Sequence, residues 1–292
     1  GDEYVQSTER HAMQDLANRL RDLGLENARI GVEMENYYYS AKAHAVLTEE
    51  LPQATLVDAT ALVNWQRIIK SEEEIGFIRR AARISEKVVQ TALDHARPGL
   101  RKNELVAEIV HAGITGVDED WGDYPAIIPL TPSGLDATAA HLTWIGYEMR
   151  EGEATFFELS GVYRRYHAPL CRTVFLGTPP KDMLEAEKAQ MEGIEAGLEA
   201  ARAGNRTCDI ANAFLGVLQK YGIHREGRCG YPIGLSYPPD WGERTASIRG
   251  EDETVLQPGM TFHFMPALWM ESCGLETTET ILIRDTGAAE PL

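Results

Sequence analysis

The first 65 residues alternate between two kinds of hydrophobic pattern. Apolar residues spaced three and four positions apart predict helices at 11–25 and 40–52. Apolar and polar residues that alternate with a period of two predict strands at 28–34 and 54–63. This order indicates a small α/β unit, which is too slight to close a hydrophobic core comfortably by itself.

A long amphipathic pattern runs from Trp65 to residue 96. Ser71 and Glu74 have the spacing of a capping box, so we expect the helix to open at Ser71. A second long helix is predicted at 181–204, and a strand, a turn and another strand are predicted at 156–173.

Residues 92–109 and 197–214 repeat one another, with matching leucine, acidic, alanine, arginine and glycine positions. Each copy is followed by a segment that begins with Tyr-Pro, at 124–130 and 231–237, and we expect both segments to be strands. Two similar pieces could meet by chance, but the shared order of helix, helix and Tyr-Pro segment favours a duplication. A duplication predicts two pseudo-symmetric halves with a cleft between them.

The composition excludes several classes of protein. A net charge of −17 over 292 residues argues against a nucleic-acid partner, whose phosphates require stripes of Lys and Arg. The sequence contains no apolar run long enough for a membrane span and no signal-peptide pattern at its start. The four cysteines form no CxxC pair, which favours reduced thiols and a cytoplasmic location.

Three segments, at 70–82, 256–266 and 274–283, resemble the catalytic domain of methionine aminopeptidases, prolidases, Xaa-Pro aminopeptidases and creatinase. The resemblance implies the pita-bread fold of that superfamily, an α/β (α+β) architecture with pseudo-twofold duplicated halves, at 66–292. Residues 1–65 resemble only the later part of the small α/β N-terminal domain of creatinase-type proteins. The resemblance therefore implies a partial N-terminal domain followed by a catalytic domain.

The peptidases of this superfamily bind two divalent metals through five side chains. The resemblance places those positions at Glu158, Pro169, Tyr231, Met265 and Thr278 of this chain. Hard divalent cations need several oxygen or nitrogen donors, and only one of these five residues is a carboxylate. We therefore expect no metal and no other cofactor. A Glu at the first position without metal is the arrangement of creatinase.

A closer likeness is to the family of ectoine hydrolases. It is carried by residues 3–13, 58–67, 122–130, 156–177, 230–245 and 259–269. Thr277 departs from the isoleucine expected there. The likeness implies metal-independent hydrolysis of the cyclic amidine ring of ectoine to N-acetyl-2,4-diaminobutyrate, with hydroxyectoine as a further candidate substrate. It also implies a homodimer.

Two residues are the main candidates for catalysis. Glu158 lies in a strand of apolar and small residues, where it would stabilise or attack the cationic amidine carbon. The resemblance places His141 at the non-ligand histidine of the superfamily, which transfers protons or positions the substrate. His167 and His263 are alternatives for that role. The sequence does not decide whether Glu158 is a nucleophile or only a counter-charge and base.

Seven further residues are candidates for binding the substrate, through hydroxyl, carboxylate, imidazole or aromatic groups. They are Tyr166, His167, Tyr231, Glu276, Glu279, Phe264 and Trp144. Glu276 is favoured over Glu279 because the period of a strand puts Glu276 on the same face as Thr278. The alternatives are a creatinase-like guanidinium hydrolase, an Xaa-Pro metallopeptidase with unusual ligands, and a non-catalytic binding protein.

Overall fold

A computed structural model describes residues 4–292 of the chain. The chain divides into two compact units, residues 1–66 and 67–292, which are described separately. Within the described residues, no helix combines the length and apolarity needed to cross a membrane.

The first unit contains two helices over a pair of parallel strands, followed by a short helix. Its elements are α1 (Ala12–Asp22), β1 (Arg29–Val32), α2 (Ala41–Glu50), β2 (Thr55–Asp58) and α3 (Leu62–Gln66). The predicted order is confirmed, but the second strand is shorter than expected. It ends because the Asp58 carboxylate accepts hydrogen bonds from the Thr60 backbone N–H at 2.9 Å and the Thr60 hydroxyl at 2.6 Å, which forms a turn.

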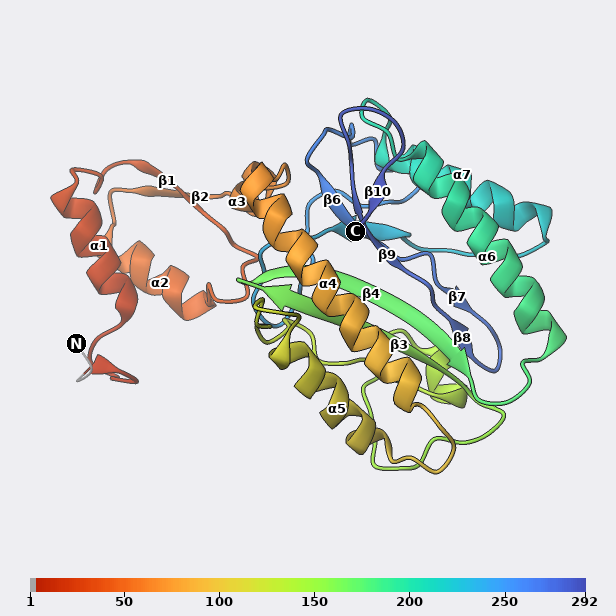
Figure 1. Ribbon diagram of the computed structural model, residues 1–292. Coiled ribbons are helices and arrows are strands. Elements are labelled where there is room, and N and C mark those ends of the chain that lie inside the picture. Colours follow the sequence, from red (N-terminus) through yellow and green to blue (C-terminus); the bar gives the residue numbers. More distant parts are fainter. Residues whose placement is uncertain (1–3) are drawn as a thin grey trace. The chain divides into compact units, whose positions relative to one another are not determined.

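The first half of the second unit is a helix pair packed on a long β-hairpin (Figure 1). Its elements are α4 (Glu72–His95), α5 (Lys102–Thr115), the 3₁₀ helix η2 (Gly134–Thr138), β3 (Ala154–Tyr163) and β4 (Tyr166–Phe175). The predicted capping box of α4 is confirmed. The Glu74 N–H donates to the Ser71 hydroxyl at 3.3 Å, and the Ser71 N–H donates to the Glu74 carboxylate at 2.8 Å.

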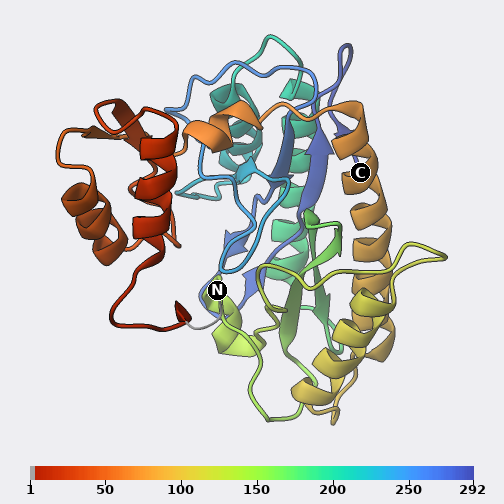
Figure 2. The ribbon, with the colours of Figure 1, turned by 90° about the vertical axis from the view of Figure 1, so that its left-hand side faces the viewer.

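The second half pairs two further helices with a four-stranded antiparallel sheet in the order β10-β9-β6-β5. The elements are α6 (Lys181–Ala200), α7 (Thr207–Lys220), β5 (Gly230–Pro232), β6 (Thr261–Phe264), β7 (Leu268–Trp269), β8 (Gly274–Leu275), β9 (Glu279–Leu282) and β10 (Glu290–Pro291). The segments 256–266 and 274–283, which carry part of the superfamily resemblance, contain the paired strands β6 and β9. Figure 2 shows α4 running along one side of the strands of this unit.

The sequence repeat is also a structural repeat. Gly99 follows α4 with φ 85°, and Gly204 follows α6 with φ 90°, a region that glycine adopts most readily. The Gly99 N–H donates to the Met149 carbonyl, and the Gly204 N–H donates to the Leu256 carbonyl, both at 2.9 Å. The turn between the two helices therefore has the same backbone conformation and the same kind of hydrogen bond in both helix pairs.

Only the second Tyr-Pro segment forms a strand. Tyr231 lies in β5, whereas residues 124–130 form no strand and contribute a single bridge, from Leu130 to Glu158. Two prolines in that segment lack an N–H to donate, and the N–H of Ala126 donates to the His167 ring instead. The strand prediction at 124–130 is therefore wrong.

Helix α4 approaches β3 closely at Gly161. A Cβ atom at this position would lie 2.3 Å from the Ala81 carbonyl oxygen and 2.4 Å from the Ser85 nitrogen. The buried Ser85 hydroxyl accepts from the Gly161 N–H at 2.7 Å and donates to the Ala168 carbonyl. One serine thus ties the helix to both strands of the hairpin.

We expect Gly161→Ala to lower the free energy of unfolding by about 1–3 kcal/mol, because the backbone of α4 would have to move away from β3. The control is Gly76→Ala on α4. An added Cβ at Gly76 would have no heavy atom within 4 Å, so this change should stabilise the protein by up to about 1 kcal/mol. Urea unfolding of both variants checks the prediction. Equal effects of the two substitutions would contradict it.

Candidate active site

The hairpin and the C-terminal strands meet at Glu158. Glu158 in β3 pairs directly with Cys171 in β4, so both side chains lie on the same face of the hairpin. Cys171 in turn forms a β-bridge with Thr278, just before β9. This junction brings residues from the two halves of the unit together.

Two carboxylates are buried at this junction. Glu158 is 2% exposed and Glu276 is 1% exposed. The backbone of Glu276 is fixed by Thr173, whose hydroxyl accepts from the Glu276 N–H at 2.8 Å and donates to its carbonyl at 2.9 Å. The Oε2 atom of Glu276 has no hydrogen-bond partner within residues 4–292. A group that supplies a donor would therefore stabilise this carboxylate.

The burial of both carboxylates favours their protonated forms. Burial raises the pKa of Glu158 well above its ordinary value, and the nearby carboxylate of Glu276 raises it further. Burial raises the pKa of Glu276 to about 8, although a hydrogen bond with the Cys171 thiol acts in the opposite direction. The pair is therefore able to retain a proton near neutral pH.

A neutral hydrogen-bonded network lies beside Glu158. The His263 ring contacts the Thr278 hydroxyl through Nε2 at 2.8 Å and the Tyr231 hydroxyl through Nδ1 at 3.1 Å. The Trp241 N–H donates to the same Tyr231 oxygen at 2.8 Å. Burial lowers the pKa of His263 to about 3, so the ring is neutral at pH 7. Its 4.0 Å separation from the Glu158 carboxylate is consequently neither an ion pair nor a hydrogen bond.

His141 and Trp144 lie in the irregular segment after η2. His141 is exposed, Trp144 is half-buried, and within the described residues no hydrogen bond or ion pair joins either side chain to Glu158. Tyr231 and Glu276 are the predicted binding residues that the fold brings closest to Glu158, since the charges of Glu276 and Glu158 interact and Glu158 raises the pKa of Tyr231.

The other predicted binding residues have different surroundings. Both ring nitrogens of the buried His167 contact backbone groups, with the Ala126 N–H donating to Nε2 at 2.9 Å. The Tyr166 hydroxyl donates to Glu74 at 2.9 Å, and Glu279 forms an ion pair with Arg172 at 2.7 Å.

Phe264 packs edge-to-face on Phe214 in the core of the second half, with their ring centroids 6.3 Å apart. The period of β6 directs Phe264 away from the face that carries His263. Within the described residues, no hydrogen bond or ion pair joins Tyr166, His167 or Glu279 to Glu158.

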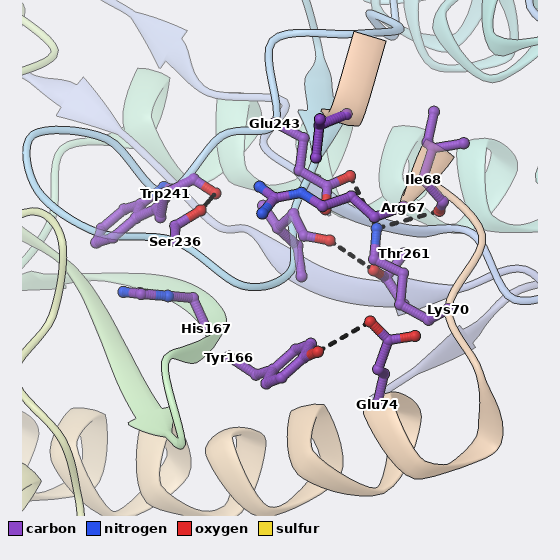
Figure 3. A network of polar contacts seen from close by, with 12 residues as sticks. Arg67, Ile68, Lys70, Glu74, Tyr166, His167, Ser236, Trp241, Glu243 and Thr261 are labelled. Carbon is purple, nitrogen blue, oxygen red and sulfur yellow. Dashed lines mark hydrogen bonds and ion pairs between the residues drawn. The ribbon is translucent and has the colours of Figure 1, made fainter. Parts of the chain in front are cut away.

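A second polar cluster fixes the loop that carries Trp241 (Figure 3). The Lys70 ammonium lies 2.8 Å from the Glu243 carboxylate, and both side chains are 1% exposed. Burial lowers the pKa of Lys70 and raises that of Glu243, and the attraction between the two opposes both shifts. The Ser236 hydroxyl donates to the Trp241 carbonyl at 3.1 Å, which closes the same loop.

Sequence reasoning did not identify Cys171, Trp241 or the Lys70–Glu243 pair. Lys70 and Glu243 are 173 positions apart, and no local pattern connects them. Cys171 could have been predicted from the hairpin pattern. A residue paired directly with Glu158 on the neighbouring strand must have its side chain on the same face of the hairpin.

Two duplicated halves around a buried polar junction are the architecture of the pita-bread class of hydrolases. Residues 76–285 match the model of metallopeptidase family M24, and residues 2–69 match the creatinase/prolidase N-terminal domain. The chain belongs to metallopeptidase family M24. The fold prediction is thereby confirmed.

Two known proteins are similar to this chain over nearly its whole length. An ectoine hydrolase of Halomonas elongata is 55% identical to this chain, over 98% of the chain and 73% of the relative. An uncharacterized hydrolase/peptidase of Sinorhizobium fredii is 40% identical, over 100% of the chain and 74% of the relative. The resemblance to the ectoine hydrolase family that the sequence indicated is thus confirmed.

Solved structures support the fold alone. A prolidase from Pyrococcus furiosus has a TM-score of 0.80 at 22% identity, covering 95% of this chain and 78% of that structure. An Xaa-Pro dipeptidase from Bacillus anthracis has a TM-score of 0.83 at 20% identity, covering 97% of this chain and 76% of that structure.

The residues of this chain do not fit the two-metal centre of the metallopeptidases. Within residues 4–292, no group of three or more His, Cys, Asp or Glu side chains is arranged to hold a metal ion. Thr278 and Tyr231, at two of the ligand positions that the resemblance implies, form neutral hydrogen bonds with His263. Pro169, at another, has no donor atom in its side chain.

We expect Lys70→Met to lower the free energy of unfolding by about 3 kcal/mol, because Glu243 would lose its buried ammonium partner. Urea unfolding of Lys70→Met, Glu243→Gln and the double variant forms a thermodynamic cycle. The double variant should be clearly less destabilised than the sum of the two single variants. Simple additivity would show that the pair is not coupled.

The stability of the protein should fall with rising pH because of Glu276. Its pKa is about 8 in the folded protein against an ordinary value of 4.5, so the folded state binds this proton more tightly than the unfolded state. Stability from this group is complete below pH 4.5 and is lost as the pH rises through 8, by at most about 5 kcal/mol.

Urea unfolding between pH 5 and pH 8.5 tests this prediction. Glu276→Gln should lose less stability over this range than the unsubstituted protein. Glu226→Gln, in which the replaced carboxylate is 88% exposed, is the matched control and should follow the unsubstituted protein. If all three curves run parallel, Glu276 does not take up a proton as proposed.

Proposed function

We propose that this chain hydrolyses ectoine, opening the cyclic amidine ring to N-acetyl-2,4-diaminobutyrate without a metal ion. The observation that carries the proposal is the buried pair Glu158 and Glu276, in a junction where the metal-ligand positions hold neutral side chains. The 55% identity to an ectoine hydrolase supports the choice of substrate.

The charge of the substrate suits this pair. An amidinium cation spreads its positive charge over two nitrogens and the carbon between them, and its N–H groups are hydrogen-bond donors. Two carboxylates in a site of low polarity attract such a cation strongly. The unpartnered Oε2 of Glu276 supplies an acceptor for an amidinium N–H.

Glu158 has one of two roles in the reaction. As a nucleophile, its carboxylate oxygen forms a bond to the amidine carbon, and water later displaces the carboxylate from that carbon. As a counter-charge and base, it accepts a proton from the water that attacks the same carbon. In either route the carbon gains the water oxygen, and a ring C–N bond breaks after its nitrogen receives a proton.

Proton transfer to the departing nitrogen has two candidates. His141 is the residue that the superfamily resemblance implies. Glu276 is the second, because its pKa of about 8 allows its carboxyl group to give and accept protons near neutral pH. His263 suits this role less well, since its pKa of about 3 makes it a weak base.

Proton NMR of the purified protein with ectoine, with and without EDTA, tests the proposal. We expect ring opening that EDTA does not slow, in protein that metal analysis finds free of stoichiometric divalent metal. Loss of activity in EDTA, restored by a divalent metal, would overturn metal independence. Absence of ring opening with ectoine, together with hydrolysis of creatine, would overturn the substrate and favour a guanidinium hydrolase.

Variants assign the roles. Glu158→Gln should lower kcat at least about 10³-fold, because the neutral amide neither attacks nor balances the cation. Replacing the residue that transfers the proton should lower kcat about 10²-fold or more. His141→Ala and Glu276→Gln test the two candidates for this role. Glu279→Gln, which removes a carboxylate paired with Arg172, is the control and should retain most of the activity.

A further inference from the structure

Arg228 places an uncommitted positive charge beside the buried carboxylates. Its guanidinium lies over the Tyr231 ring, with 4.3 Å between Cζ and the ring centroid. The residue is exposed, and within residues 4–292 its guanidinium forms no hydrogen bond or ion pair. A guanidinium has five N–H donors, so all of them remain available to a ligand or to water.

A short chain of contacts connects Arg228 with Glu158. The Tyr231 ring beneath the guanidinium carries the hydroxyl that contacts His263 at 3.1 Å, and His263 lies 4.0 Å from the Glu158 carboxylate. The charge of Arg228 acts across this distance, since it lowers the pKa of both Glu158 and His263. Arg228 is thus close enough to influence a molecule bound at Glu158.

The neighbouring Arg225 fixes the backbone from which Arg228 extends. Its guanidinium donates to the Ala267 carbonyl at 2.7 Å, to the Arg228 carbonyl at 2.8 Å and to the Gly227 carbonyl at 3.2 Å. Arg225 is therefore occupied with main-chain groups. Of the two arginines in this turn, Arg228 is the one whose guanidinium has no hydrogen-bond partner within residues 4–292.

Asp240 is an acidic group near this position. Its charge raises the pKa of Glu158 and of Tyr231, and its Oδ1 accepts from the Gly242 N–H at 2.9 Å. The surroundings of Tyr231 therefore combine an available cation with anionic groups. A zwitterionic ligand matches such a distribution of charge.

We propose that Arg228 binds the carboxylate of the substrate while Glu158 and Glu276 bind its amidinium, so that Arg228 selects zwitterionic amidines over simple cations. This inference rests on the proposed function and names a specificity-determining residue for it. Arginine suits the role because its planar donors match the two oxygens of a carboxylate.

The test compares two substrates that differ only in the carboxylate, namely ectoine and 2-methyl-1,4,5,6-tetrahydropyrimidine. Arg228→Gln should raise KM for ectoine about 10- to 100-fold, the loss expected for one charge-assisted contact, and change kcat much less. KM for the analogue should stay within about twofold. Arg228→Lys, which keeps the charge but not the planar fork, should give an intermediate KM for ectoine.

Arg80→Gln is the matched control. Arg80 also lies over a tyrosine ring, that of Tyr163 at 5.1 Å, and its removal changes the net charge by the same amount. This variant should leave KM for both substrates unchanged. If Arg228→Gln weakens both substrates equally, Arg228 acts only by supporting Tyr231, and the inference is overturned.

Calorimetric binding separates this inference from the proposed function. If the unsubstituted protein does not hydrolyse ectoine, the proposed function fails, and binding of the same two compounds then decides the role of Arg228. A loss of at least about tenfold in affinity for ectoine alone, on Arg228→Gln, would sustain a carboxylate site at Arg228. Equal affinities of the two proteins, or no binding of ectoine to either, would overturn it.

Discussion

The burial of two acidic side chains in one junction is the constraint on which the rest of the site depends. Removing a carboxylate from water costs several kcal/mol unless a partner compensates, and Glu158 and Glu276 also repel one another when both are charged. Within the described residues, neither carboxylate forms an ion pair with a Lys or Arg side chain. The unfavourable burial is tolerated by retention of a proton, and a cationic ligand would relieve it in full.

The neutral hydrogen-bonded network around His263 keeps Glu158 without a positively charged partner. A protonated histidine 4.0 Å from Glu158 would balance the carboxylate and weaken its attraction for a cationic ligand. The pKa of about 3 prevents this, because burial disfavours the charged ring and Arg228 repels it. Tyr231 and Thr278 then fix the ring by hydrogen bonds that need no charge, and the Trp241 N–H donates to the same Tyr231 hydroxyl. The hydrogen-bonded network thus leaves Glu158 beside a fixed, neutral His263 ring rather than beside a positively charged partner.

Local sequence patterns predicted the elements that local physics determines. The capping box at Ser71, the repeated helix pairs and the β3–β4 hairpin depend on residues close together in the chain. Features that depend on distant segments were not predictable in this way. His167 accepts from the backbone of Ala126, Phe264 packs on Phe214, and Lys70 reaches Glu243, each through a contact that only the folded chain creates. The Tyr-Pro segment at 124–130 failed as a strand for the same reason.

The metal-ligand positions implied by the superfamily resemblance include Pro169, Tyr231 and Thr278, and the effects of these three residues are linked. Pro169 or Thr278 alone would leave a damaged metal centre, with the remaining acids mutually repelled. Tyr231 and Thr278 both form hydrogen bonds with His263, so these two implied ligand positions hold uncharged, hydrogen-bonded side chains. A divalent cation needs many donors at short distance, whereas an amidinium spreads its charge and brings its own N–H donors. Two carboxylates are too few for the first kind of cation and sufficient for the second, which favours the proposed amidinium substrate over a divalent metal at this junction.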